Sequence, residues 1–293
     1  MIVITTPTGD IGSQVVDRVL DSGEPARVIV RDPSRLPQHV RAQAEVVEGS
    51  HGDADTITKA LEGADRLFLL VPPAGFRDAG PAGRYYLDFA RAAAQEAASR
   101  GVRMVHVTSL GHGFQERAGL LSAALDMDEL IAATGVRHRA LALPFFMENL
   151  LRQAQSITEQ GVFSMANSAH RPLLTVATRD VAAAAAALLL DTAWSGQARV
   201  PLVAPDSLTP DAMAEIISET LGRTVRYQQI PLADFRARLV QHGASPALAE
   251  DMAAMVDAQN DGIYDAEPHD PASATATGFR QWCQDVLKPA VRS

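Results

Sequence analysis

The first twenty residues constrain the fold of this chain more than any other segment. An apolar run, Ile2–Thr5, leads directly into a turn with glycines at positions 9 and 12, and an amphipathic stretch begins at Ser13. A strand, a tight glycine turn and a helix in this order let the backbone approach a pyrophosphate and aim helix N–H groups at it. Gly9 would permit the close approach, and Gly12 would let the helix pack onto the strand. The segment therefore predicts a dinucleotide-binding unit, although a tight turn without a ligand gives the same pair of glycines.

The rest of the first half alternates short apolar runs with helical stretches. This alternation is typical of βαβ units and a parallel sheet, and several runs are almost wholly apolar, as expected where helices cover both faces. We expect an α/β fold, a Rossmann-type doubly wound parallel sheet with a smaller C-terminal α/β cap. The predicted strands are Ile2–Thr5, Arg27–Arg31, Glu45–Glu48, Arg66–Val71, Met104–Thr108 and Arg139–Leu143, and the predicted helices are Ser13–Ser22, Asp55–Leu61, Tyr86–Arg100 and Asp126–Thr134.

After Pro144 the alternation becomes looser. Thr209-Pro210-Asp211 predicts a helix start, with threonine at the N-cap and proline at the first helical position. We expect residues 1–150 to form the nucleotide-binding domain, completed by part of 175–205, and residues 151–293 to form the cap. Further predicted elements are a helix around Ala182–Ala187 with Asp180 near its start, strands at Arg199–Ala204 and Thr224–Ile230, helices at Ala233–His242, Ala247–Ala258 and Phe279–Leu287, and a loop at Asp265–Gly278.

Composition excludes several classes of protein. The single cysteine, Cys283, rules out an intramolecular disulfide framework and fits a reducing compartment. A net charge of −9 argues against nucleic-acid binding. No apolar run reaches the ~20 residues of a membrane span, and the N-terminus lacks the basic region of a signal peptide. We expect a cytoplasmic monomer or homodimer that binds a small-molecule substrate and neither nucleic acid nor membrane.

Five further blocks in the first half resemble the NmrA-like family of atypical short-chain dehydrogenases/reductases, which includes NADPH:quinone reductases and isoflavone-reductase-like enzymes. Residues 208–231 resemble its cap region more loosely. That family's turn usually reads Thr-Gly-x-x-Gly-x-x-Gly, and Thr6 stands where the first glycine belongs; threonine makes this turn if its backbone stays in an ordinary region. The five blocks are Val28–Pro33, Glu45–Gly49, Ala60–Asp65 running into Leu69–Pro73, Val105–Gly111 and Pro144–Asn149.

The resemblance implies that the chain binds NADP(H). Arg31 ends the second predicted strand, where an arginine accommodates the 2′-phosphate of NADP and a carboxylate accepts from the 2′-OH of NAD. Arg35 would add a second cation. The alternative is a solvated pair of Arg31 with Asp32, and Asp32 keeps the NAD role open. The residues implied for cofactor binding are Thr6, Thr8, Gly9, Asp10, Ile11, Gly12, Arg31, Arg35, Val71, Pro72, Thr108, Pro144 and Phe145.

Proton-donating residues are scarce in this sequence. No tyrosine is followed four residues later by lysine, and the only lysines are Lys59 and Lys288, so the usual Tyr-x-x-x-Lys pair is absent. Isoflavone-reductase-like relatives carry a lysine where Ala124–Glu129 has none. The catalytic candidates are therefore His112, in a glycine-flanked loop, and Ser109, at the end of the fifth strand. Solvent exposure of His112 and turn capping by Ser109 are the alternatives.

Apolar and amide side chains complete the predicted site. The resemblance places Phe146 and Asn149 along the nicotinamide and substrate cleft, and Tyr86 is a further substrate candidate; each also fits simple packing. His51 reads as structural, and no Asp, His or Glu cluster has metal-ligand spacing. The function this implies is hydride transfer from NADPH to a small apolar carbonyl, enone or quinone. The alternative is a non-catalytic NADP(H)-binding redox sensor.

Overall fold

The central sheet of the protein has the order that defines a doubly wound nucleotide-binding fold. A computed structural model describes residues 1–72 and 82–292. Its seven parallel strands run in the order β10-β6-β5-β4-β1-β2-β3, which confirms the predicted fold class. They are β1 (Ile2–Ile4), β2 (Ala26–Val30), β3 (Glu45–Glu48), β4 (Arg66–Leu69), β5 (Arg103–Ser109), β6 (His138–Leu143) and β10 (Gln197–Pro201).

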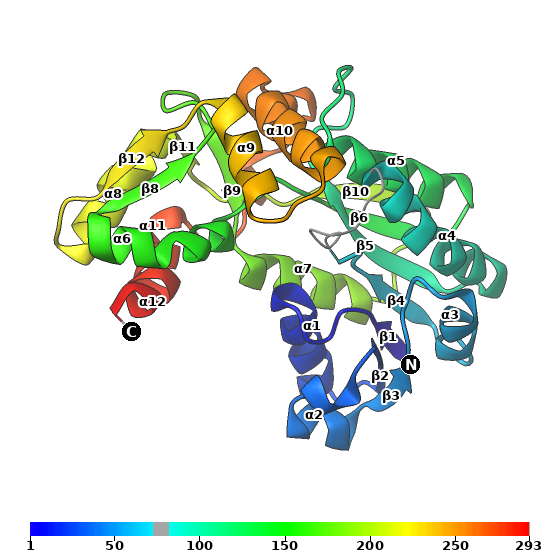
Figure 1. The fold of residues 1–293 in the computed structure, drawn as a ribbon. Helices are drawn as coiled ribbons and strands as arrows, with labels where there is room; N and C mark the ends of the chain where they lie inside the picture. Colours follow the sequence, from blue (N-terminus) through cyan, green and yellow to red (C-terminus); the bar gives the residue numbers. More distant parts are fainter. Residues whose placement is uncertain (73–81, 293) are drawn as a thin grey trace.

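Helices cover both faces of this sheet (Figure 1). Successive strand residues face opposite sides, so Ile2 and Ile4 pack with one layer of helices whereas Val3 packs with the other. The first layer holds α1 (Asp10–Asp21), α2 (Gln38–Gln43) and α7 (Thr178–Leu190), and the second holds α3 (Ala54–Ala60), α4 (Ala82–Arg100) and α5 (Leu120–Ala133).

The strand order reverses direction between β1 and β4. The chain leaves β1 toward β2 and β3, then returns to the other side of β1 with β4, β5 and β6. Ligands of open α/β sheets bind beyond the carboxyl ends of the strands at such a switch point. The segments that follow β1, β4, β5 and β6 therefore outline the candidate site.

A smaller part built from the C-terminal half lies over these strand ends (Figure 1). Its own core surrounds the buried rings of Phe163, Phe279 and Trp282. It contains a three-stranded sheet of β7 (Phe145–Phe146), β9 (Leu173–Val176) and β11 (Ser207–Leu208), a two-stranded sheet of β8 (Val162–Met165) and β12 (Arg226–Gln229), and the helices α6 (Ala154–Gln160), α8 (Pro210–Leu221), α9 (Leu232–Gln241), α10 (Pro246–Asp261), α11 (Phe279–Trp282) and α12 (Lys288–Arg292).

Four short helical turns connect these elements, and a π-helical turn, η5 (Cys283–Leu287), joins α11 to α12. The 3-10 turns are η1 (Pro33–Arg35), η2 (Met147–Gln153), η3 (Ile263–Ala266) and η4 (Pro271–Ser273). Within the described residues, no helix combines the length and apolar character that crossing a bilayer requires.

The predicted elements and the observed ones agree best where the signal is local. Helix α8 begins at Pro210, and the Thr209 side chain accepts the Ala212 N–H, as the sequence predicts. Helix α5 begins at Leu120, six residues before the predicted start. Pro73, which ends one of the blocks that resemble the family, lies outside the described residues.

Candidate functional site

The turn after β1 is closed by contacts between its own backbone atoms. Gly9 donates its N–H to the Thr6 carbonyl over 3.0 Å. A Cβ placed on Gly12 would lie 2.1 Å from that same carbonyl oxygen, so position 12 accepts no side chain. Gly9 is the N-cap of α1 and no side chain caps this helix, which leaves its first N–H groups available to an anion. The geometry fits the pyrophosphate of a dinucleotide.

Thr6 has a left-handed backbone conformation. Its φ is 50°, and it is the one residue other than glycine with positive φ in the described part of the chain. The condition stated for a threonine at this turn, an ordinary backbone region, is therefore not met. Glycine adopts a left-handed backbone freely, whereas threonine adopts it at a steric cost. The Thr6 hydroxyl is buried and has no hydrogen-bond partner among the described residues.

The two charged residues after β2 differ in how they are held. The Asp32 carboxylate accepts the N–H and the hydroxyl of Ser34, over 3.0 and 2.6 Å, and these hydrogen bonds lower the pKa of Asp32. Asp32 thus caps η1. The exposed Arg31 guanidinium has neither a hydrogen bond nor an ion pair to any described residue. Arg31 and the exposed Arg35, nearby in sequence, could pair with a phosphate.

The end of β4 is tied to the turn through Thr5. The Leu70 N–H donates to the Thr5 hydroxyl over 2.9 Å, and Val71 and Pro72 follow, with Val71 buried. His51 lies in the same region, where it packs edge-on against Phe89 with ring centroids 5.1 Å apart. Burial lowers the pKa of His51 to about 4, which keeps its ring neutral.

At the end of β5, the predicted hydroxyl groups are buried and engaged. Thr108 donates to the Ala124 carbonyl over 3.0 Å, and Ser109 donates to the Leu110 carbonyl over 2.7 Å. The His112 side chain is exposed. The structure therefore brings Ser109 and His112 to one loop at the predicted sheet edge. Their catalytic roles stay predictions.

The segment after β6 crosses from the sheet to the cap. Phe145 and Phe146 form β7, opposite Thr175 and Val176 of β9. Phe145 packs against the cap core, and Phe146 packs against the core under α1 and α7. Both rings are partly buried, as are Asn149 and the more distant Tyr86 of α4, while Pro144 is buried.

Glu148, which the sequence analysis did not single out, joins three parts of the fold. Its two carboxylate oxygens accept the Thr178 N–H at the start of α7 and the Trp282 indole N–H of α11, each over 3.1 Å. No local pattern identifies such a residue, because its partners lie 30 and 134 positions away.

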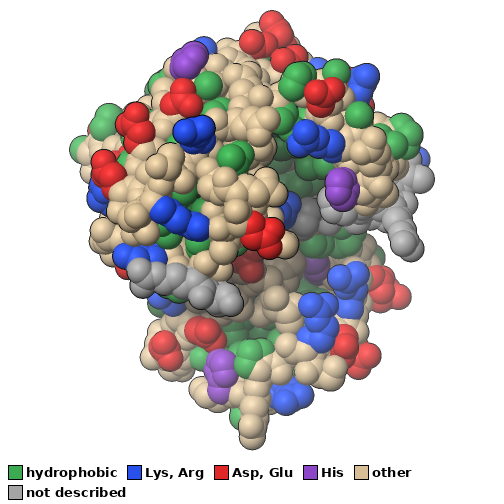
Figure 2. All heavy atoms as spheres, turned by 60° about the vertical axis from the view of Figure 1, so that its left-hand side comes forward, with side chains coloured by type: hydrophobic (Ala, Val, Ile, Leu, Met, Phe, Trp, Pro, Cys, Tyr) green, Lys and Arg blue, Asp and Glu red, His purple; other side chains and the backbone are tan. Residues whose placement is uncertain are grey.

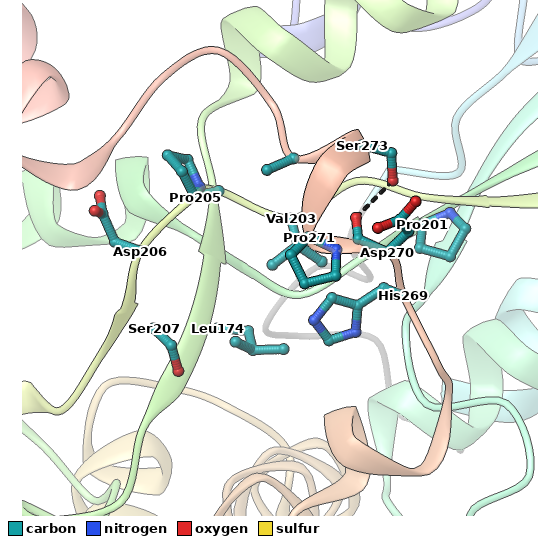
Figure 3. Close-up of a pocket in the computed structure, with 12 residues that line it drawn as sticks. Leu174, Pro201, Val203, Pro205, Asp206, Ser207, His269, Asp270, Pro271 and Ser273 are labelled. Atoms are coloured by element: carbon teal, nitrogen blue, oxygen red, sulfur yellow. Dashed lines mark hydrogen bonds between the residues drawn. The ribbon is translucent and has the colours of Figure 1, made fainter.

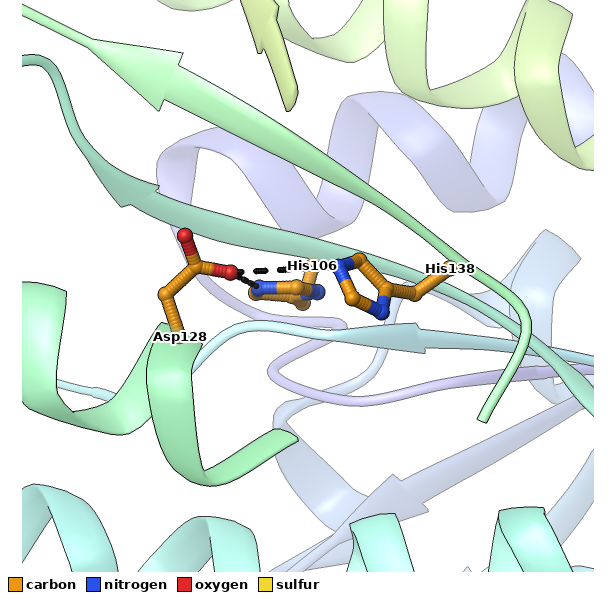
Figure 4. A group of neighbouring side chains, drawn as sticks. All are labelled: His106, Asp128 and His138. Carbon is orange, nitrogen blue, oxygen red and sulfur yellow. Dashed lines mark hydrogen bonds and ion pairs between the residues drawn. The ribbon is translucent and has the colours of Figure 1, made fainter. Parts of the chain in front are cut away.

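Beneath the β5 end lies a buried polar cluster of His106, Asp128 and His138 (Figure 4). His106 Nε2 is 2.9 Å and His138 Nε2 is 4.0 Å from the same Asp128 oxygen. Burial opposes ionisation of Asp128, yet the hydrogen bond from His106 and the nearby Arg199 hold its pKa below the usual value. Burial lowers the pKa of His138 to about 4.

This cluster has the donor types of a metal site, although their spacing along the sequence gave no such signal. The three side chains could each offer one ligand atom, and those atoms lie within 4.8 Å of one another. However, Arg199 already pairs with the second Asp128 oxygen. Its guanidinium supplies the positive charge that an ion would otherwise provide.

The surface is hollowed between the cap above and the nucleotide-binding elements below (Figure 2). A separate pocket of about 170 Å³ lies on the cap side of β10 and includes Leu174, Val203, His269 and Pro271 in its lining (Figure 3). Sites for drug-sized ligands occupy roughly 300–1,000 Å³, so this pocket is too small for a dinucleotide. The strand order places the candidate site at the strand ends instead.

Family models match most of the chain. Residues 7–192 match an NAD(P)H-binding family, and residues 121–282 match the NmrA-like family. Quinone oxidoreductase 2 of Escherichia coli is 29% identical over 269 residues, which cover 90% of each chain. A (4-alkanoyl-5-oxo-2,5-dihydrofuran-3-yl)methyl phosphate reductase of Streptomyces griseus is 31% identical over 245 residues, covering 82% of this chain and 80% of the relative.

Solved structures share the whole architecture. The Escherichia coli NADPH-dependent quinone oxidoreductase complexed with NADPH superposes with a TM-score of 0.77 at 24% identity, covering 100% of this chain and 99% of the other. At this identity the likeness establishes the fold. It agrees with the strand order and the cap observed here.

Proposed function

Because the chain belongs to the NmrA-like family of NAD(P)H-binding proteins, we propose that it is an NADPH-dependent oxidoreductase whose substrate is a small apolar conjugated carbonyl compound, such as a quinone or an enone. The observation that carries the cofactor choice is at the end of β2. Arg31 is unpaired among the described residues, while both hydrogen bonds from Ser34 go to a single oxygen, Oδ1, of Asp32. A cation without a partner favours the 2′-phosphate of NADP(H).

The glycine turn and the β5 and β6 ends would hold the rest of the cofactor. The Gly9–Gly12 backbone and the free N-terminus of α1 take the pyrophosphate. Val71, Pro72, Thr108, Pro144 and Phe145 lie at neighbouring strand ends, where they would bracket the nicotinamide. NADPH, when bound, supplies the hydride, so the protein needs to orient the acceptor and exclude water.

The proposed class of hydride acceptor follows from the scarcity of side chains that could donate a proton. The Ser109 hydroxyl is buried and donates to a carbonyl, and the sequence has no Tyr-x-x-x-Lys pair. When a quinone or enone accepts a hydride, the negative charge is delocalised onto a carbonyl oxygen, and water can supply the proton. The names of the two relatives, a quinone oxidoreductase and a 5-oxo-2,5-dihydrofuran reductase, both describe conjugated carbonyl chemistry. Phe146, Asn149 and Tyr86 are the proposed substrate contacts, and His112 is the proposed proton donor for acceptors that need one.

The test is direct. The purified protein is mixed with NADPH or NADH and a panel of benzoquinones, naphthoquinones and enones, and the absorbance of the reduced nicotinamide is followed. The proposal expects turnover with at least one conjugated acceptor and faster turnover with NADPH. Tight NADPH binding with no turnover of any acceptor would instead support a redox sensor.

A further inference from the structure

A carboxylate from the C-terminal segment holds the loop that ends β5. Glu267 directly follows η3, and its Oε2 accepts the N–H groups of Gly111 and His112 over 2.9 and 3.0 Å. The two partners are more than 150 residues away in sequence. Only 8% of Glu267 is exposed. Two adjacent backbone donors thus converge on one buried anion, which is the geometry of a backbone nest.

Arg199 of β10 fixes this carboxylate and the start of the same loop. Its Nε and Nη2 donate to the two Glu267 oxygens over 2.7 and 2.8 Å, and Nη2 also donates to the Ser109 carbonyl over 2.8 Å. Nη1 pairs with Asp128. The planar guanidinium therefore sets the direction of the carboxylate as well as its charge.

The loop between Ser109 and Gly113 depends on this support. Gly111 and Gly113 have φ values of 112° and 96°, a conformation that glycine adopts freely and does not itself maintain. Gly111 also packs under Ile263, because a Cβ there would lie 2.4 Å from Ile263 Cγ1. The ion pair, in which the carboxylate is buried and the guanidinium is partly exposed, holds the backbone, while the His112 side chain is exposed.

We propose that Glu267, oriented by Arg199, is a positioning residue that fixes the Ser109–Gly113 loop, and with it His112, at the carboxyl end of β5 where the acceptor is reduced. The inference rests on the proposed function for the location of the acceptor. The contact of Gly111 with Ile263 would be enough to pack the loop against the cap. The carboxylate adds direction, because it specifies where two successive N–H groups point. The cap thereby determines the geometry of a loop that belongs to the nucleotide-binding part.

The experiment compares Glu267→Gln with Asp206→Asn in the full chain. Asp206 is a matched control, since it also lies in the C-terminal half and accepts a backbone N–H, that of Phe279, over 2.6 Å. The measurements are kcat and KM with a soluble benzoquinone, the Kd for NADPH, and the thermal midpoint. We expect Glu267→Gln to lower kcat at least tenfold with the Kd for NADPH within twofold of wild type. Asp206→Asn should leave kcat unchanged.

Arg199→Lys provides a second variant in case Glu267→Gln does not fold. It retains the charge and loses the planar fork, so we expect it to lower kcat in the same way. Equal kcat losses in the Glu267 and Asp206 variants would overturn the proposal, because they would indicate general weakening of the cap. A loss of NADPH affinity as large as the loss of kcat would also overturn it.

Amide hydrogen exchange separates this inference from the proposed function. Glu267→Gln should raise the exchange rates of Gly111 and His112 at least tenfold and leave the amide of Val105, within β5, unchanged. If the wild-type protein reduces no acceptor, the proposed function fails, and the exchange rates still report whether Glu267 holds the loop. Unchanged exchange together with unchanged kcat in folded Glu267→Gln overturns the inference alone.

Discussion

The Gly12 Cα faces the Thr6 carbonyl so closely that a β-carbon on Gly12 would lie 2.1 Å from the Thr6 oxygen. This contact explains the glycine better than the expected contact between helix and strand does, because Thr6 belongs to the turn after β1. The left-handed backbone of Thr6 turns its carbonyl toward α1, where the same oxygen also accepts the Gly9 N–H. The two residues define the turn together.

Gly12→Val should abolish NADP(H) binding and lower stability. The new side chain must displace backbone, which typically destabilises by roughly 1–3 kcal/mol. Gly83→Ala is the control, because Gly83 is also helical and a Cβ there meets nothing within 4 Å. Calorimetric titration with NADP⁺ checks the prediction. Unchanged affinity in a folded Gly12→Val protein would show that the nucleotide binds elsewhere.

Arg31→Ala should weaken NADP(H) binding and leave NAD(H) binding nearly unchanged. A charged hydrogen-bond partner contributes roughly 1.5–3 kcal/mol, which corresponds to about a 10- to 150-fold increase in the Kd for NADP(H). Arg41→Ala, at another exposed arginine on α2, should change neither constant. Equal dissociation constants for the two nucleotides in the wild-type protein would rule out the assigned role of Arg31.

The nucleotide-binding half could be predicted because its signals are local. Each of its first six strands is a run of three to seven residues with at least two apolar side chains, and the turn at Gly9 and Gly12 lies between β1 and α1. Thr209 likewise caps α8 through a residue three positions on. Interactions between residues only a few positions apart can be recognised from the sequence alone.

The cap and its contacts with the site were harder to predict. Strand β7 has two residues and acquires its identity only by pairing with β9. Glu267 accepts the Gly111 N–H from a distance of 156 positions along the chain. The cluster of buried polar side chains comes from two strands and a helix, and consists of His106, Asp128 and His138. Such contacts depend on the assembled topology. The left-handed backbone of Thr6 is likewise set by the surrounding turn, which overrides the local preference of threonine.

The protein should lose stability as the pH falls from 7 toward 4, and His51 should account for part of the loss. Its pKa of about 4 in the folded state compares with about 6.5 in an unfolded chain. Between these values the unfolded state binds the extra proton, so the contribution is present above pH 6.5 and is lost as the pH falls through 4. One such ring contributes roughly 2 kcal/mol to the loss between pH 7 and pH 5.

His51→Gln removes this titration. Urea unfolding at pH 7 and pH 5 should therefore show a loss in the variant that is smaller by about 2 kcal/mol than the wild-type loss. His242→Gln, at an exposed ring, should retain the full wild-type loss. An identical pH dependence in wild type and His51→Gln would contradict the assignment.

Metal removal should leave the protein intact. Arg199 pairs with Asp128 in the only cluster of potential metal ligands found among residues 1–72 and 82–292, so a cation would add uncompensated positive charge. Dialysis against a strong chelator should change neither the thermal midpoint nor the Kd for NADPH. One equivalent of zinc retained after dialysis against buffer alone, and lost with a drop in the midpoint upon chelation, would contradict this prediction.

Thr6→Gly should raise stability and bind NADP(H) at least as tightly as wild type. A left-handed backbone destabilises a residue that has a β-carbon by roughly 1–2 kcal/mol. Glycine removes this cost, but its greater freedom in the unfolded chain offsets part of the stabilisation. A net increase of about 1 kcal/mol in the free energy of unfolding is expected.

The buried Thr6 hydroxyl offers the contrary possibility for NADP(H) binding, since it has no partner among the described residues and a phosphate oxygen would accept its hydrogen bond. Thr6→Ser separates the two, because it keeps the hydroxyl and the strained backbone. If both variants bind NADP⁺ like the wild type in titrations at one salt concentration, the hydroxyl is not a ligand. If Thr6→Gly loses tenfold or more of its affinity for NADP⁺ while Thr6→Ser does not, the Thr6 hydroxyl donates to the phosphate. The loss would then exceed the ~1 kcal/mol of a typical net hydrogen bond, and our preference for a purely steric role would be wrong.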